Sequence, residues 1–326
     1  MFYAIRHFTR YRYSQPVWQS MMEVRMHPRS EGNQRCFIFQ LSVNPRARIF
    51  AHTDSRGNLV HHFDLPARHR QLTIISDALV NIDAQQTLPE NMSYDVWGEL
   101  EQMIETKDFW DELMPSHFAR PSPELEELAA EIGVADRDGR NPLLFLQDVA
   151  AGVYRSFTYV KKSTAVNSPI EHALRSRQGV CQDFAHIMIT LVRKANIPCR
   201  YVSGYLYHSS QNTDRSADGA THAWVEAMIP GIGWVGYDPT NNLLVGERHI
   251  RTAVGRDYAD VPPTMGTMKG KAETELQVRV RVTPSEAVLP PDEEFAADEE
   301  WSQFLEEDHQ TQLVRAEQQQ QQQQQE

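Results

Sequence analysis

The chain has 326 residues, of which 40% are hydrophobic, and it carries a formal net charge of −12 at pH 7. That length and apolar content are enough for two domains with buried cores, and they exclude a chain that is disordered throughout. Twelve acidic residues and one arginine lie in residues 283–326, so the rest of the chain is nearly neutral. Because no basic stripe is present to neutralise phosphates, we expect no nucleic-acid partner.

The cysteines and the apolar runs indicate a compartment. Cys36, Cys181 and Cys199 are an odd number without the spacing of metal ligands, which is typical of a reducing cytosol. The residues after Met1 form no apolar signal core, and no apolar run approaches the ~18 residues of a membrane span. We therefore expect a cytoplasmic protein without a membrane partner, whose oligomeric state the sequence does not indicate.

Residues 1–85 predict a β-rich domain. Aromatic and β-branched residues are interrupted by turn signals such as Asp54-Ser55-Arg56-Gly57-Asn58, a strand-and-hairpin pattern. Candidate strands cover residues 40–43, 48–52, 59–65 and 72–82. We expect a small antiparallel sandwich or sheet.

Helices are expected in the next part of the chain. Residues 86–120 form a polar linker with one weak helix near 98–113, and a domain core is predicted over 121–283. Ser122-Pro123 and Asn141-Pro142 each combine a favourable N-cap with proline at the first helical position. Ser168-Pro169 predicts a third, short helix.

A fourth helix starts at a cysteine. Apolar residues recur at spacings of three and four from Phe184 to Ala195, and Asn196-Ile197-Pro198 ends the pattern. Cys181 then lies in the first turn, where unpaired N–H groups and the helix dipole favour an anion. A thiol in this position loses its proton more easily, and the thiolate is the nucleophile. Gly179 would leave the approach to the sulfur clear. The alternative is that Cys181 is a small buried hydrophobic residue.

Two later strands carry a candidate base and acid. Residues 222–226 and 233–238 read as strands joined by a turn at 230–233. If the hairpin apex lies near Pro230, His222 is opposite Asp238 on one face, whereas a turn confined to 230–233 puts Asp238 on the other face. In the first register Asp238 orients the imidazole of His222, which takes the proton of Cys181.

Other residues are weaker candidates. Trp224, Arg256 and Asp257 are possible substrate contacts, with packing or loop-stabilising roles as alternatives. The polar stretch over 208–220 is expected to be a loop that overhangs the site. Alternating residues over 276–282 predict an edge or closing strand, and residues 284–326 an acidic, glutamine-rich disordered tail.

Three sequence blocks resemble a known family. RQGVCQDFAH, HAWVE and GWVGYDPTNN, in this order, resemble the motifs of the bacterial transglutaminase-like family within the papain-like cysteine hydrolase superfamily. The resemblance extends over residues 1 to about 283. It implies an α+β fold, in which an antiparallel β domain precedes a core whose cysteine-bearing helix packs on an antiparallel sheet. It also implies Cys181 as nucleophile, His222 as base and Asp238 as orienting acid, with neither cofactor nor metal.

These residues favour a cysteine-dependent acyl-transfer enzyme that acts on a peptide or isopeptide-like amide through a thioester. The oxyanion would be held by the Cys181 backbone N–H and a second donor that the sequence does not identify. Water as acceptor makes the enzyme a peptidase or amidase, and an amine makes it a transamidase. A non-catalytic protein-interaction scaffold is the alternative from another class.

Overall fold

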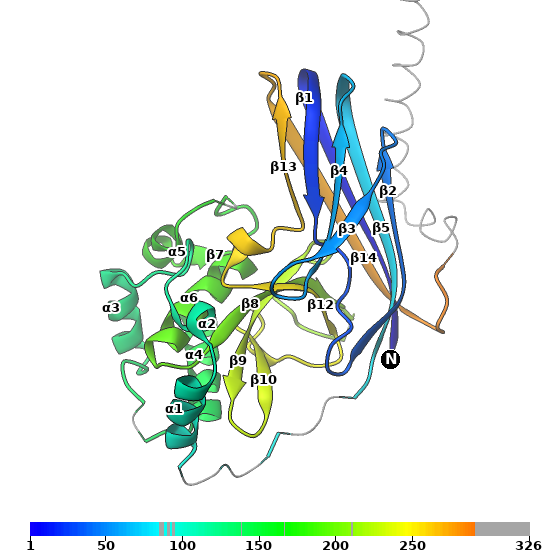
Figure 1. Ribbon diagram of the computed structural model, residues 1–326. Coiled ribbons are helices and arrows are strands. Elements are labelled where there is room, and N and C mark those ends of the chain that lie inside the picture. Colours follow the sequence, from blue (N-terminus) through cyan, green and yellow to red (C-terminus); the bar gives the residue numbers. More distant parts are fainter. Residues whose placement is uncertain are drawn as a thin grey trace, which may run out of the picture.

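The computed structural model describes residues 1–84, 88–89, 92, 95–137, 139–165, 167–209 and 211–290. Within them a tall antiparallel sheet stands beside a smaller sheet that is covered by helices (Figure 1). This arrangement confirms the predicted α+β fold with a β domain ahead of a helix-containing core. Most of the predicted tail, residues 291–326, lies outside the described residues.

The N-terminal sheet has seven strands, built around a β1 of 23 residues. The first half of β1 pairs with β5 on one side and β14 on the other, and the second half pairs with β4 and β13. The predicted hairpin strands are therefore present. The strands are β1 (Phe2–Val24), β2 (Gln34–Asn44), β3 (Phe50–Thr53), β4 (Leu59–Leu65), β5 (His69–Ile82), β13 (Thr264–Lys269) and β14 (Thr274–Ser285).

β13 and β14 correct the predicted domain limits. We expected residues 121–283 to form one core, but both strands return to the N-terminal sheet and pair with β1, where Tyr11 lies opposite Leu276. β14 also continues to Ser285, past the expected start of the tail. The alternation of residues identified the strand, whereas its partner, more than 260 positions away, is set by tertiary packing.

The core sheet has five strands in the order β11-β10-β9-β8-β12. α6 packs on β9 and β8, and α4 packs on α6, so the cysteine-bearing helix is enclosed between the sheet and another helix. The strands of this sheet are β8 (Cys199–Leu206), β9 (His222–Ile229), β10 (Gly233–Asp238), β11 (Leu243–Leu244) and β12 (His249–Gly255).

Two helices begin where the capping signals predicted, whereas the helix predicted from Ser168-Pro169 begins one residue later, with Pro169 as its N-cap. The Leu125 N–H donates to the Ser122 side chain, and the Leu144 N–H donates to the Asn141 side chain. The weak helix of the linker is two helices, α1 and α2. The helices are α1 (Val96–Thr106), α2 (Trp110–Leu113), α3 (Pro123–Glu131), α4 (Pro142–Ser156), α5 (Ile170–Ser176), α6 (Cys181–Lys194) and the 3-10 helix η1 (Tyr258–Asp260).

Two amide side chains of the N-terminal domain cover the open edge of β12. Gln34 accepts from the Arg251 N–H at 2.8 Å and donates to the Arg251 carbonyl at 2.8 Å. Asn58 makes the equivalent pair with Val254, at 2.8 and 2.9 Å. These contacts imitate the two bonds that a neighbouring strand would make, so the core sheet ends against the N-terminal domain rather than against solvent.

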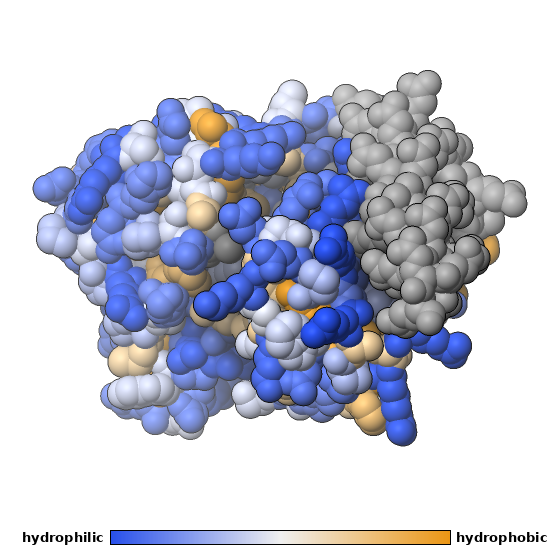
Figure 2. All heavy atoms as spheres, turned by 90° about the horizontal axis from the view of Figure 1, so that it is seen from above, coloured by the Kyte–Doolittle hydropathy of each residue, from blue (hydrophilic) through white to orange (hydrophobic). Residues whose placement is uncertain are grey.

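The face of the molecule that is seen from above is mainly polar (Figure 2). Seen from above, the described residues present a mainly hydrophilic face with small hydrophobic patches (Figure 2). Each helix of the described segments is too short or too polar to span a lipid bilayer.

Candidate active site

The first turn of α6 places Cys181 at the helix start, as predicted. Val180 is the N-cap, and its N–H donates to the Asp183 carboxylate at 2.8 Å. The Thr164 hydroxyl donates to the same carboxylate oxygen at 2.6 Å. Cys181 is half-buried in this turn. The N–H groups of residues 181–183 cannot have partners four residues back, so this end of the helix favours an anion.

Gly179 is needed for a reason that the sequence did not indicate. A β-carbon at this position would lie 3.0 Å from the Asp183 side chain and 3.2 Å from the Phe184 ring. Gly179 pairs in β7 (Gln178–Gly179) with β6 (Thr158–Tyr159), directly ahead of the helix. The glycine therefore allows the first turn of α6 to pack closely, rather than clearing the approach to the sulfur.

The β9–β10 hairpin follows neither of the two expected registers. Gly233 pairs with Ile229 and Tyr237 pairs with Val225, so three residues form the turn. Continuing this register by one residue puts Asp238 opposite Trp224. Because Trp224 is two positions from His222, Asp238 and His222 still share a face.

His222 lies between the acid and the thiol. Its Nε2 is 2.8 Å from Asp238 Oδ2, and its ring also hydrogen-bonds the side chain of Cys181. Burial would lower the pKa of His222, but the Asp238 carboxylate and Cys181 raise it to about 10. The imidazole is therefore cationic at neutral pH, with the Asp238 carboxylate as its counter-ion. The structure thus brings the three predicted residues together.

Asp238 is buried and accepts hydrogen bonds at both oxygens. Oδ1 accepts from the Thr240 and Asn241 N–H groups at 2.9 and 3.2 Å. Oδ2 accepts from His222, from Asn241 Nδ2 at 2.7 Å and from His249 Nε2 at 3.3 Å. Burial would raise the pKa of Asp238, but His222 and His249 hold it far below its usual range. The carboxylate therefore stays ionised and has one orientation.

His249 is a residue that sequence reasoning missed. Its Nδ1 accepts from the Gly246 N–H at 3.3 Å, so Nε2 carries the hydrogen and donates to Asp238. Burial lowers the pKa of His249 despite the nearby carboxylate, which keeps the ring neutral. A lone histidine in a strand gave no signal, since its partner lies on another strand.

Asp238 and the two histidines that bond it resemble a set of metal ligands. Donor atoms of His222, Asp238 and His249 lie within 4.8 Å of one another, a grouping that the sequence spacing did not predict. Both imidazole Nε2 atoms are directed at the same carboxylate oxygen. A metal ion here would have to replace these hydrogen bonds, because a protonated ring nitrogen has no lone pair to offer.

Trp224 is not placed to touch a substrate. Its side chain is 0% exposed and packs beneath both histidines, with ring centroids 6.1 Å from His222 and 5.2 Å from His249. This corrects the expectation of a substrate contact. Trp224 shares a face of β9 with His222, but the two histidines and the core residues Val202, Val245 and Val254 cover its indole.

Asp257 and Arg256 also lie away from the reacting groups. Asp257 is 1% exposed and accepts from the Phe118 and Ala259 N–H groups at 2.7 and 2.8 Å, so it stabilises a loop. Arg256 pairs with Asp260 at 2.9 Å, and its carbonyl accepts from Arg193 in the last turn of α6. A helix of 14 residues is about 20 Å long, so Arg256 lies near the end opposite Cys181.

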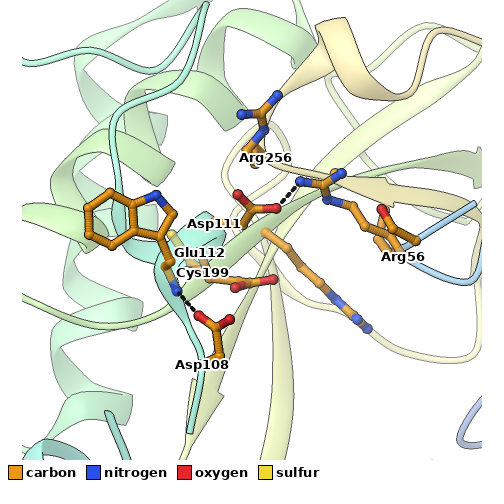
Figure 3. A pocket seen from close by; sticks show the side chains of 11 residues that line it. Arg56, Asp108, Asp111, Glu112, Cys199 and Arg256 are labelled. Atoms are coloured by element: carbon orange, nitrogen blue, oxygen red, sulfur yellow. Dashed lines mark hydrogen bonds and ion pairs between the residues drawn. The ribbon is translucent and has the colours of Figure 1, made fainter. Parts of the chain in front are cut away.

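Arg256 lines a separate pocket at that end. The pocket has a volume of about 440 Å³, and Arg56, Asp111 and Cys199 are among the other residues that line it (Figure 3). Arg56 and Asp111 form an ion pair across it. Cys199 is fully buried.

Two tyrosines, rather than the predicted charged residues, lie near enough to Cys181 for its charge to raise their pKa. Burial raises the pKa of Tyr159 to about 12, and the charge of Cys181 adds to the shift. Burial, then Tyr11 and Cys181, raise the pKa of Tyr258 to about 12. Both remain protonated at neutral pH, so they present hydroxyl donors near the cysteine. Tyr258 directly follows Asp257 in the sequence, but the sequence analysis selected the charged residues of this segment and not the tyrosine.

Two family models match the chain. The bacterial transglutaminase-like N-terminal region matches residues 3–81, and the transglutaminase-like superfamily model matches residues 127–239. The second match includes all three of the predicted catalytic positions.

Curated relatives cover most of the chain. An uncharacterized protein of Mycobacterium leprae is 34% identical over 278 residues, which is 85% of this chain and 96% of the relative. An uncharacterized protein of Mycobacterium tuberculosis is 33% identical over 300 residues, covering 87% of this chain and 93% of the relative. A protein-glutamine gamma-glutamyltransferase of Pseudomonas aeruginosa is 26% identical over 195 residues, which are 56% of this chain and 29% of that protein.

A solved structure shares the fold. A proposed cysteine protease of Cytophaga hutchinsonii superposes with a TM-score of 0.63 at 21% sequence identity, covering 88% of this chain and 92% of that chain. The likeness thus includes both the β domain and the core.

Proposed function

Because the chain belongs to the transglutaminase-like superfamily and carries the bacterial transglutaminase-like N-terminal region, we propose that it is a cysteine-dependent acyl-transfer enzyme acting on amide bonds. One observation carries the proposal: His222 is held between Asp238 and the thiol at the start of α6. This arrangement supports an enzyme over a non-catalytic scaffold. The buried imidazole has a pKa raised to about 10 and lies next to a thiol, and strongly shifted pKa values beside a reactive group are typical of catalytic sites.

The proposed reaction begins with attack by the Cys181 thiolate on the amide carbonyl carbon. The negative oxygen of the tetrahedral intermediate accepts from the Cys181 backbone N–H, with a neighbouring tyrosine hydroxyl as the second donor. When the C–N bond breaks, His222 gives its proton to the leaving amine and a thioester remains. Neutral His222 then takes a proton from the incoming water or amine, and Cys181 leaves as thiolate.

The acceptor distinguishes two activities. Water releases a carboxylic acid, and this peptidase or amidase activity is the one we propose. The partial similarity to a protein-glutamine gamma-glutamyltransferase favours the alternative, in which a primary amine forms a new amide. Both share the thioester on Cys181, so one experiment examines the step they have in common.

That experiment is mass spectrometry of the protein after incubation with a peptide library, with and without an added primary amine. We expect an acyl adduct on Cys181 that is absent from the Cys181→Ala variant. Decay of the adduct to acid indicates a hydrolase, and decay to a new amide indicates a transamidase. A library that leaves no adduct on Cys181 under any condition, while unlabelled protein remains folded, would contradict the proposal.

A further inference from the structure

The outer edge of β14 is an open strand edge. β14 pairs with β1 along one side, and in an antiparallel ladder alternate residues direct their backbone groups to opposite sides. The Val280 N–H donates away from β1, to the Gly219 carbonyl at 2.9 Å. Leu276 and Val278, four and two residues earlier, therefore direct their N–H and C=O groups outward as well. Within the described residues these outward groups have no partner.

Apolar side chains accompany this edge. Val280 is 6% exposed and packs with Tyr205 and Ile250 of the core, whereas Val278 is 40% exposed and Leu276 is 51% exposed. Since these three side chains share one face of β14, the packing between the domains continues into an exposed apolar strip. A free edge with exposed apolar residues promotes unwanted pairing, and proteins usually cover or charge such edges.

One end of the edge is bonded to the segment that leads into His222. Gly219, which bonds Val280, is three residues ahead of His222. At the other end Leu276 lies opposite Tyr11, whose hydroxyl hydrogen-bonds the Thr264 hydroxyl at 2.6 Å. The exposed strip thus extends from the segment that precedes His222 toward the segment that follows Tyr258. In Figure 1 the tall sheet that contains β14 rises next to the helices of the core.

We propose that the outer edge of β14 binds the substrate as an extended peptide, which adds one strand to the N-terminal sheet beside Cys181. The peptide backbone would bond the outward N–H and C=O groups of Leu276 and Val278, and its alternate apolar side chains would cover the exposed strip. Only a peptide backbone offers donors and acceptors at the spacing of a strand. The inference rests on the proposed function, for which it names the substrate class.

Binding can be measured without turnover. The protein is the Cys181→Ala variant of the full chain, and the probe is a fluorescein-labelled, end-blocked heptapeptide in which valine alternates with threonine and glutamine. Val278→Pro removes the outward N–H but no hydrogen bond to β1. Leu276→Ser combined with Val278→Ser keeps the backbone and removes the apolar strip. Leu144→Ser, at an exposed apolar residue of α4, is the matched control.

We expect both edge variants to weaken peptide binding about tenfold or more, from the lost backbone bond or the lost apolar burial, and the control to leave it unchanged. A peptide with N-methyl groups at alternate residues should bind the Cys181→Ala protein as weakly as the unmethylated peptide binds the edge variants. In the chain with Cys181 present, the double serine variant should keep its rate of alkylation by iodoacetamide.

Equal affinity in all variants, or no binding of the heptapeptide, would overturn the inference. The inference would also be overturned if the protein formed a dimer and the edge variants dissociated it, because a second copy would then occupy the edge. Tighter peptide binding after deletion of residues 291–326 would overturn it as well, because the C-terminal residues of the chain would then occupy the edge. Edge-dependent binding in a protein that never forms an acyl adduct would support this inference and contradict the proposed function.

Discussion

Asp238 and Glu226 are both buried carboxylates on neighbouring strands of the core sheet, but their partners differ. Asp238 faces two histidines, whereas Glu226 lies 2.7 Å from Arg200 and also binds Arg251. Burial would raise the pKa of Glu226, but Arg251 and Arg200 lower it to about 2. A low pKa and complete burial are therefore common to the two sites and do not distinguish them.

The partners decide what each carboxylate can do. A guanidinium stays charged at any pH at which the protein is folded, so the Glu226 cluster can hold charge but cannot transfer a proton. An imidazole can do both, and His222 additionally contacts the Cys181 side chain. Arg200 also reaches Glu31 of the N-terminal domain at 3.4 Å. The comparison teaches that a buried carboxylate indicates a catalytic site only where its partner is a group that can gain and lose a proton and lies next to a nucleophilic side chain.

Removing the proposed nucleophile or the proposed base should have the largest effect on turnover. Cys181→Ala and His222→Ala are each expected to lower kcat by at least about four orders of magnitude, and the double variant by little more, because the residues act as one unit. The measurement is turnover of an amide identified by the adduct experiment, with circular dichroism as the check of folding. Full activity in folded Cys181→Ala would reject the mechanism.

Asp238→Asn should cost less than either of those changes, and its loss should depend on pH. The folded-state pKa of His222, about 10, exceeds its ordinary 6.5, so the catalytic proton and the stability it confers are present at low pH and lost as pH rises through 10. Without the Asp238 charge this loss should begin at lower pH. A pH profile of kcat that superposes on that of the wild type would show that Asp238 does not charge-stabilise the base.

His249→Gln should have an intermediate effect, about 10-fold to 100-fold on turnover, by analogy with other residues that orient a reacting group through a hydrogen bond. The variant removes an imidazole N–H from Asp238 but leaves the negative charge. We therefore expect kcat to fall, KM to be unchanged, and the alkaline limb of the pH profile to move only slightly. A large shift of that limb would instead indicate that His249 shares the proton with His222.

Glu226→Gln should leave turnover per folded molecule unchanged and lower stability. Losing the carboxylate charge leaves Arg200 and Arg251 without their buried partner, which costs about 3–5 kcal/mol. The depressed pKa of Glu226 means that its contribution is present above the ordinary value of 4.5 and is lost as pH falls toward 2. Urea unfolding should thus show a difference between variant and wild type that shrinks in acid.

A loss of turnover in folded Glu226→Gln would break the distinction between the two buried carboxylates. It would mean that the arginine cluster, through β9, also positions His222.

Local signals in the sequence were enough for the helices and for the position of Cys181. Ser122 and Asn141 cap helices because their side chains reach an N–H group three residues away, a contact that depends on neighbouring residues alone. The same holds for Cys181, whose place at the start of α6 follows from the apolar spacing after it and from the proline that ends the helix.

Only the tertiary structure decided which distant segments meet. His249 and Asp238 lie on strands at separate positions of the core sheet, and β14 pairs with β1 from the far end of the chain. The register of the β9–β10 hairpin, which differs from both expected registers, likewise depends on what each face packs against. Alternation specifies that a strand has two faces, whereas its partner and register are chosen by burial and hydrogen bonds summed over the whole domain.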